Sequence, residues 1–233
     1  MAGQKQYWKP GNMLYPVPAV MVTCQRPGEK PNIITIAWAG TVCSDPAMVS
    51  ISIRRERYSH ALIQETGEFV INLTTAALAK AADFCGVRSG RDMDKFKETG
   101  LTPCPSKEVQ CPGIAESPVN IECRVTEIKS LGSHDLFLAD VLNVGVDVSL
   151  LDSAGSLQLG RSGLVAYSHG GYFELGRQLG SFGYSVRKKE TEKKKKEIQK
   201  KETEKKKKEI QKKETEKKKK EIQKKKKQEE DVN

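Results

Sequence analysis

The chain has 233 residues and carries 40 basic against 30 acidic side chains, which gives a net charge of +10. The positive excess lies in one place: residues 188–233 contain 22 lysines and 12 acidic residues, so residues 1–187 contain 18 of each sign. The positive net charge of the chain is therefore no indication that residues 1–187 bind nucleic acid. This part is long enough to bury a hydrophobic core of its own.

The sequence lacks several features of exported and membrane proteins. The N-terminal residues contain no apolar h-region, and no apolar run reaches the ~18–20 residues that cross a bilayer. The six cysteines are scattered, without a CxxC pair and without a histidine at metal-ligand spacing. We therefore expect a cytoplasmic, reduced protein without a metal site. A disulfide between Cys104 and Cys111 is the alternative that this spacing leaves open.

Strands are the commonest expected elements. Alternating or apolar runs predict strands at residues 18–25, 32–40, 47–55 and 68–73, and two longer ones within residues 118–147. The turn residues between the first two runs indicate a hairpin. Helical spacing predicts a helix over 60–67 that ends at Gly67, and another over 76–86 with Thr74 or Thr75 as its cap.

The remaining segments are polar or rich in glycine. Residues 87–103 are expected to form a loop with room for one helical turn, and residues 164–189 an irregular segment rich in glycine and aromatic residues. The sequence contains no repeated strand–helix–strand pattern. These features favour a mainly β protein, an antiparallel barrel rather than a doubly wound sheet.

The last 46 residues are of a different kind. The 12-residue string KKETEKKKKEIQ occurs three times without a gap, at 188–199, 200–211 and 212–223. Favourable Glu-to-Lys pairs four residues apart support a helix, but a repeat of 12 residues places its isoleucines on three different faces. We therefore expect a solvated helix or a disordered segment, and not a coiled coil. Contact of this tail with nucleic acid or an anionic membrane, and a scaffold role based on it, remain alternatives.

Familiar motifs for nucleotide binding and hydrolysis are missing. The sequence has neither a GxGxxG after a strand nor a GxxxxGK[ST] phosphate loop, and no GxSxG nucleophile motif. Its three histidines lie far apart in the sequence. If the protein is an enzyme, a bound cofactor is the natural carrier of its chemistry.

Five strings carry a resemblance to a known family. In chain order they are NIITIAWAGTVCSDPAMVSISIRRERYSHALIQETGEFVINL, FCGVRSGRDMDKF, SPVNIECRV, LGSHDLFLADV and GLVAYSHGGYFELG. Together, over residues 10–187, they resemble the flavin reductase-like, FMN-binding split-barrel family, and within it the flavoredoxin-type proteins. The repeat tail lies outside the resemblance.

The resemblance implies a fold and a function. The expected fold of residues 1–187 is a six-stranded antiparallel split β-barrel of Greek-key type with small helices, followed by the tail at 188–233. The expected assembly is a homodimer with FMN near the subunit interface. The implied activity is that of an oxidoreductase, which passes electrons from NADH or NADPH through FMN to a small-molecule or protein acceptor. A flavoprotein electron carrier without its own nicotinamide site is the alternative.

The resemblance also implies the residues that contact FMN. They are Asn32, Thr35, Trp38, Ser52, Arg54, Arg57, Tyr58, Ser59, Lys95, His134 and an aromatic residue among Tyr167, Tyr172 and Phe173. Cations and hydroxyl groups suit the phosphate, and an aromatic side chain suits the isoalloxazine wall. A positive charge on His134 or Lys95 would favour the anionic reduced flavin.

One inconsistency concerns the segment 32–46. In a flat strand Asn32 and Trp38 share a face, and Thr35 lies on the other one. The three side chains therefore need a bulge or a sharp twist near residues 36–38 to reach one ligand, or one of them is misassigned.

Overall fold

The computed structural model describes residues 3–186, 198–201 and 203–204, and the chain divides into two compact units, 1–177 and 178–233. The domain boundary expected at 187/188 lies outside the described residues, as does most of the repeat tail. The six described tail residues are helical. No helix among the described residues has the length and apolar character to span a bilayer.

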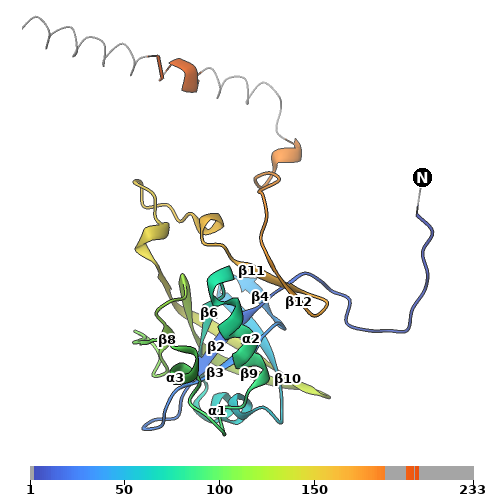
Figure 1. Ribbon diagram of the computed structural model, residues 1–233, viewed down its shortest axis with the longest axis vertical. Helices are drawn as coiled ribbons and strands as arrows, with labels where there is room; N and C mark the ends of the chain where they lie inside the picture. Colours follow the sequence, from blue (N-terminus) through green and yellow to red (C-terminus); the bar gives the residue numbers. More distant parts are fainter. Residues whose placement is uncertain (1–2, 187–197, 202, 205–233) are drawn as a thin grey trace, which may run out of the picture. The chain divides into compact units, whose positions relative to one another are not determined.

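The first unit is built on one large antiparallel sheet (Figure 1). Its seven strands, in their order across the sheet, are β3 (Asn32–Ile36), β2 (Val20–Cys24), β6 (Glu68–Leu73), β9 (Val119–Leu131), β10 (His134–Val146), β5 (Ala47–Arg54) and β4 (Ala39–Ser44). Three of the neighbour pairs, β2 with β6, β6 with β9 and β10 with β5, are distant in sequence. Such non-consecutive pairs are the Greek-key element of the predicted fold.

Shorter elements complete the described chain. The further strands are β1 (Val17–Pro18), β7 (Pro103–Cys104), β8 (Gly113–Ile114), β11 (Val165–Ser168) and β12 (Gly171–Glu174). The α-helices are α1 (Tyr58–Thr66), α2 (Ala79–Val87) and α3 (Lys95–Thr99). The 3₁₀ turns are η1 (Ala76–Leu78), η2 (Val148–Leu150), η3 (Leu159–Arg161) and η4 (Tyr184–Val186).

Alternation along the strands builds the barrel core. On β5 the apolar residues Val49, Ile51 and Ile53 are buried, and Arg54 at the end of the strand is exposed. Phe69 of β6 and Phe137 of β10 are fully buried in the same cluster. Burial of each such side chain stabilises the fold by roughly 1.5–3 kcal/mol, which makes this cluster the main source of stability.

A second apolar cluster holds the helices on the outside of the sheet. Met21 of β2 and Ile33 of β3 point away from the barrel core and pack with Ala82 and Cys85 of α2 and with Phe96 of α3. In Figure 1, α2 and α3 accordingly lie against β2 and β3. This packing places the loop between α2 and α3 beside the start of β3.

The mainly β class, the split barrel, the β2–β3 hairpin and the long β9–β10 pair are confirmed. Gly67 ends α1 with a φ of 67°, as expected, and all six cysteines are free. The main sheet has seven strands, one more than the six expected of the barrel. The chain bends at Ala37–Trp38 and continues as β4, so the expected strand 32–40 is two strands.

Two further expectations are wrong. Thr75 precedes η1 without a side-chain cap bond, and the buried Oγ1 of Thr74 has no hydrogen-bond partner among the described residues. The segment 164–189 is also more regular than expected, because β11 and β12 form a hairpin that pairs with β1. Glycines at its turn, including Gly170 with a φ of 91°, had suggested an irregular loop and instead permit the tight turn.

A buried amide connects four strands of the first unit. Asn72 of β6 donates from Nδ2 to the carbonyl oxygen of Met21 at 2.9 Å. Its Oδ1 accepts bonds from the backbone N–H of Ile114 at 2.9 Å and from Nδ2 of Asn120 at 2.7 Å. Asn72 is fully buried, so water cannot replace these partners.

We expect Asn72→Leu to lower the free energy of unfolding by about 3 kcal/mol, because the amide groups of Ile114 and Asn120 lose a buried acceptor. Urea unfolding followed by circular dichroism measures this change. Asn12→Leu, at an exposed position, is the control and should stay within about 0.5 kcal/mol of the wild type. A loss below about 1 kcal/mol in Asn72→Leu would contradict the importance of the buried amide.

Candidate functional site

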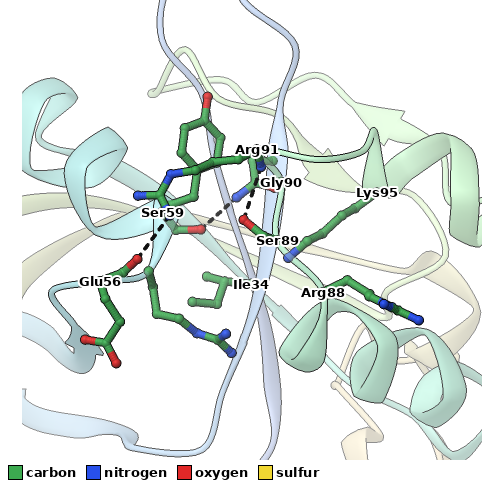
Figure 2. A pocket seen from close by; sticks show the side chains of 11 residues that line it. Ile34, Glu56, Ser59, Arg88, Ser89, Gly90, Arg91 and Lys95 are labelled. Carbon is green, nitrogen blue, oxygen red and sulfur yellow. Dashed lines mark hydrogen bonds between the residues drawn. The ribbon is translucent and has the colours of Figure 1, made fainter.

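Two neighbouring cavities lie where the barrel is split between β3 and β5, and both are lined by Ile34 and Arg57. The first, which we call the cationic cavity, has a volume of about 140 Å³. Its lining residues are Asn32, Ile34, Glu56, Arg57, Tyr58, Ser59, Arg88, Ser89, Gly90, Arg91 and Lys95 (Figure 2). The second, the tryptophan cavity, has a volume of about 160 Å³. Its lining residues are Ile34, Thr35, Ile36, Ala37, Trp38, Ser52, Ile53, Arg54, Arg57 and His134.

The cationic cavity has two walls from distant parts of the sequence. One wall is the turn between β5 and α1, residues 56–59, and the other is the loop between α2 and α3, residues 88–91. Four cationic side chains line this cavity against the single carboxylate of Glu56, in a body whose charges otherwise balance. Hydroxyl groups of Ser59 and Ser89 lie among the cations. This combination suits a phosphate or another small anion.

The first wall is fixed from behind by a buried carboxylate. Asp135 of β10 lies 2.9 Å from Nε2 of His60 on α1, and it accepts a bond from Nε of Arg55 at 2.9 Å. Arg55, and then His60 and Ser130, hold the pKa of Asp135 at about 2, so the carboxylate is charged at neutral pH. These contacts join the start of α1 to β10 and thereby position the turn 56–59.

Lys95 connects the cavity to the elements behind it. Its side chain is only 3% exposed, and Nζ donates to the carbonyl oxygens of Ile33 at 2.6 Å and of Cys85 at 2.8 Å. Burial lowers the pKa of Lys95 to about 8. An ammonium group has three donors, so the third remains for an acceptor in the cationic cavity. Lys95 is thus a buried cation at the start of α3.

Asn32 and Ser59 form the contact between the strand and the turn. Nδ2 of Asn32 donates to Oγ of Ser59 at 2.7 Å, and both side chains are buried. Arg57 extends from the same turn toward α2 and donates to the carbonyl oxygen of Gly86. The first residue of β3, the β5–α1 turn and α2 thus meet at one place.

The tryptophan cavity depends on the bend that ends β3. Ala37 and Trp38 form this bend, and the carbonyl oxygen of Trp38 accepts a bond from the N–H of Ser52 at 2.8 Å. Thr35 lies beside α2 and donates from Oγ1 to the carbonyl oxygen of Ala82. The bend resolves the inconsistency in the sequence: Asn32 lines the cationic cavity, whereas Thr35 and Trp38 line the tryptophan cavity.

His134 lines the tryptophan cavity next to Arg54. Burial lowers the pKa of His134, and the neighbouring positive charge of Arg54 lowers it further. This lowered pKa disfavours a positive charge on His134, so Lys95 is the better candidate of the two residues expected to supply that charge. The sequence did not reveal this effect, because Arg54 becomes a neighbour only through the pairing of β5 with β10.

The three aromatic candidates lie outside both cavities. Tyr167 is linked to Trp38 through Tyr15, with ring centroids 6.2 and 6.1 Å apart. Tyr172 packs against Tyr167 at 5.5 Å and donates to Oδ1 of Asp83 at 3.3 Å, and Phe173 is 58% exposed. Tyr167 is thus the candidate with a ring connection to Trp38.

Ten of the expected site residues line the two cavities: Asn32, Thr35, Trp38, Ser52, Arg54, Arg57, Tyr58, Ser59, Lys95 and His134. Sequence reasoning did not assign the polar side of the second wall, Arg88, Ser89, Gly90 and Arg91, nor Glu56. A signal was available in RSGR, which places two arginines around Ser-Gly directly after a helix.

We expect the free energy of unfolding of the wild type, measured relative to that of Lys95→Met, to rise with pH. The rise should be on the order of 2 kcal/mol between pH values of about 8 and about 10.5. The pKa of Lys95 is about 8 in the folded chain, so the unfolded chain binds more protons in this window, and stability then rises with pH. Chemical unfolding across the pH range measures the difference. Lys80→Met, at an exposed position on α2, is the control, and its difference should stay constant. A difference for Lys95→Met that is flat or falls with pH would contradict the burial of the charge.

Comparison with known proteins gives the site its context. Residues 12–176 match the model of the flavin reductase like domain. The structure of flavoredoxin from Desulfovibrio vulgaris (Miyazaki F) superposes with a TM-score of 0.74 at 30% identity, over 79% of this chain and 100% of that one. An uncharacterized protein from Archaeoglobus fulgidus is 38% identical over 116 residues, which are 50% of this chain and 66% of the relative.

A relative with an assigned activity is more distant. The NADPH-flavin oxidoreductase of Streptomyces viridifaciens is 27% identical over 130 residues, or 55% of this chain and 66% of that protein. The domain match contains every residue that lines the two cavities. The chain belongs to the flavin reductase like family of split-barrel proteins.

Proposed function

We propose that the protein is an FMN-dependent oxidoreductase that takes electrons from NADH or NADPH and passes them to an acceptor. The observation that carries this proposal is the pair of neighbouring cavities, one cationic and one walled by Trp38, on a barrel of the flavin reductase like family. Similarity to an NADPH-flavin oxidoreductase supports the use of a nicotinamide reductant.

The residues of the two cavities fit the two ends of FMN. A phosphate needs cations and short donors, which the cationic cavity provides through Arg57, Arg88, Lys95 and Ser59. An isoalloxazine ring needs a flat apolar wall with a few polar groups, which Trp38 and Ile36 with Ser52 provide in the tryptophan cavity. A single cationic end suits a mononucleotide.

FMN, when bound, supplies the capacity to accept two electrons and to release them together or singly. The protein residues then bind and orient. Arg57, on the border of both cavities, would hold the cofactor in register, and its bond to Gly86 fixes the guanidinium. His134, whose pKa is lowered by burial and by Arg54, would offer a hydrogen-bonding nitrogen at the tryptophan cavity.

The second candidate is a flavoprotein electron carrier without its own nicotinamide site. Similarity to flavoredoxin favours it, at 30% identity over the full length of that chain. The two candidates share the FMN site and differ in the source of the electrons.

We expect the purified protein to be yellow, with FMN bound at close to one per chain, and to lose its visible flavin absorption on anaerobic addition of NADH or NADPH. Anaerobic absorption spectroscopy measures both properties in one sample. A colourless protein that cannot be reconstituted with FMN would rule out the proposal. A yellow protein that neither nicotinamide bleaches, but dithionite does, would instead establish the carrier.

The proposed assembly is a homodimer. β4 forms one edge of the main sheet, most of its residues are exposed, and Val42 on it is 49% exposed. An exposed apolar edge strand is a surface that proteins normally cover. We expect light scattering of the FMN-loaded protein to give twice the mass of the 25.9 kDa chain. A mass of one chain at micromolar concentration would show that this edge is not used for dimerisation.

A further inference from the structure

The two walls of the cationic cavity are bridged by one side chain. Arg91, on the α2–α3 loop, reaches across to the β5–α1 turn, where Nη1 donates to the carbonyl oxygen of Glu56 at 3.2 Å. The guanidinium carbon also lies 5.5 Å from the ring centroid of Tyr58, within the range of a cation–π interaction. Figure 2 shows Arg91 extending over the cavity toward Glu56.

The loop that carries Arg91 lies unusually close to the opposite wall. A Cβ atom at Gly90 would lie 2.0 Å from Oδ1 of Asn32 and 3.1 Å from Cδ1 of Tyr58, so only glycine fits there. The next turn of the loop is held by the bond from the N–H of Arg91 to Oγ of Ser89 at 3.2 Å. Arg91 is therefore presented to Tyr58 by a backbone that has little freedom.

The rest of the loop is attached at its two ends. Its first residue follows α2, which packs on β3, and Lys95 at its far end is bonded to Ile33 and Cys85. Asp94 additionally pairs with Lys30 at 3.3 Å. Between these ends, the contacts of Gly90 and Arg91 hold the middle of the loop against the turn 56–59. An anion in the cavity would leave between these two walls.

The geometry points to Arg91 as a clasp across the phosphate end of the site. This inference rests on the proposed function, since the ligand is the phosphate of FMN. Arg91 acts as a positioning residue: its contacts with Tyr58 and Glu56 keep the walls together after the cofactor has entered. The clasp slows the release of FMN, so that the protein retains FMN between reaction cycles.

A simpler role for Arg91 would be to attract the phosphate by charge alone. The two roles differ in how Tyr58 matters. A clasp requires the aromatic face of Tyr58, because Arg91 packs against it. The attraction between the charge of Arg91 and the phosphate does not depend on which residue is at position 58. The two roles also affect different rates, because a clasp changes dissociation and long-range charge changes association.

The experiment compares FMN dissociation from the loaded wild type, Arg91→Lys, Tyr58→Leu, Tyr58→Phe and the double variant Arg91→Lys/Tyr58→Leu. Release is followed by the return of free FMN fluorescence after dilution, and association by the quenching of FMN on mixing with the apoprotein. Arg124→Lys is the matched control, because it is the same substitution at a residue that lines neither cavity.

We expect dissociation to become about fivefold faster in Arg91→Lys, which keeps the charge but loses the planar fork, and about threefold faster in Tyr58→Leu. Tyr58→Phe keeps the aromatic face and should release FMN more slowly than Tyr58→Leu. The double variant should release FMN no faster than Arg91→Lys alone, because both changes break one contact. Association rates and the Arg124→Lys control should be unchanged.

The results separate the clasp from the proposed function. If the wild type retains FMN and both Arg91→Lys and Tyr58→Leu release FMN at the same rate as the wild type, the clasp is overturned. The proposed function is then left intact. Additive effects in the double variant would also overturn the clasp, since each residue would then contact FMN independently. A wild type that binds no FMN would remove the proposed function and the clasp together.

Discussion

The buried ammonium group of Lys95 is the interaction on which the site depends. Its bonds to the carbonyl oxygens of Ile33 and Cys85 join β3, α2 and the start of α3 at one point. Both carbonyl groups belong to backbone beside the cationic cavity, and a neutral apolar side chain in place of Lys95 would leave them unpaired. A buried charge is costly, which the lowered pKa of Lys95 reflects, so this arrangement suits a site that an anion completes.

From this point the two cavities follow from the shape of the barrel. Strands β3 and β4 form the two edges of the sheet, and the bend at Ala37–Trp38 carries the chain from β3 to β4, which pairs with β5. Because β3 ends at this bend, its first residue faces the β5–α1 turn while its last residues face the end of β5. One short strand thus contributes to two chemically different environments.

Much of this could be predicted from the sequence, for identifiable reasons. Alternation located β5 and the long β9–β10 pair, and the order of the family strings placed ten polar or aromatic residues at one split of the barrel. What could not be predicted depended on contacts between distant segments. The lowered pKa of His134 reflects its burial and its pairing with Arg54, and the support of α1 requires Asp135 beside His60, 75 residues away in sequence. The bridge from Arg91 to Tyr58 is of the same kind.

The electrostatics of the two cavities also differ in a way that fits a cofactor with one charged end. Positive side chains gather in the cationic cavity, where Glu56 offsets only one of them, whereas burial and Arg54 lower the pKa of His134 in the tryptophan cavity. A dianion would gain the full attraction of the first cavity, while a neutral ring in the second would meet hydroxyl groups and apolar surface. Because the two cavities share Arg57, the charged end of a ligand determines where its ring lies. The shape of the tryptophan cavity and a few hydrogen bonds can then provide the specificity for the ring. The binding of the anion in the cationic cavity can provide most of the affinity for the ligand.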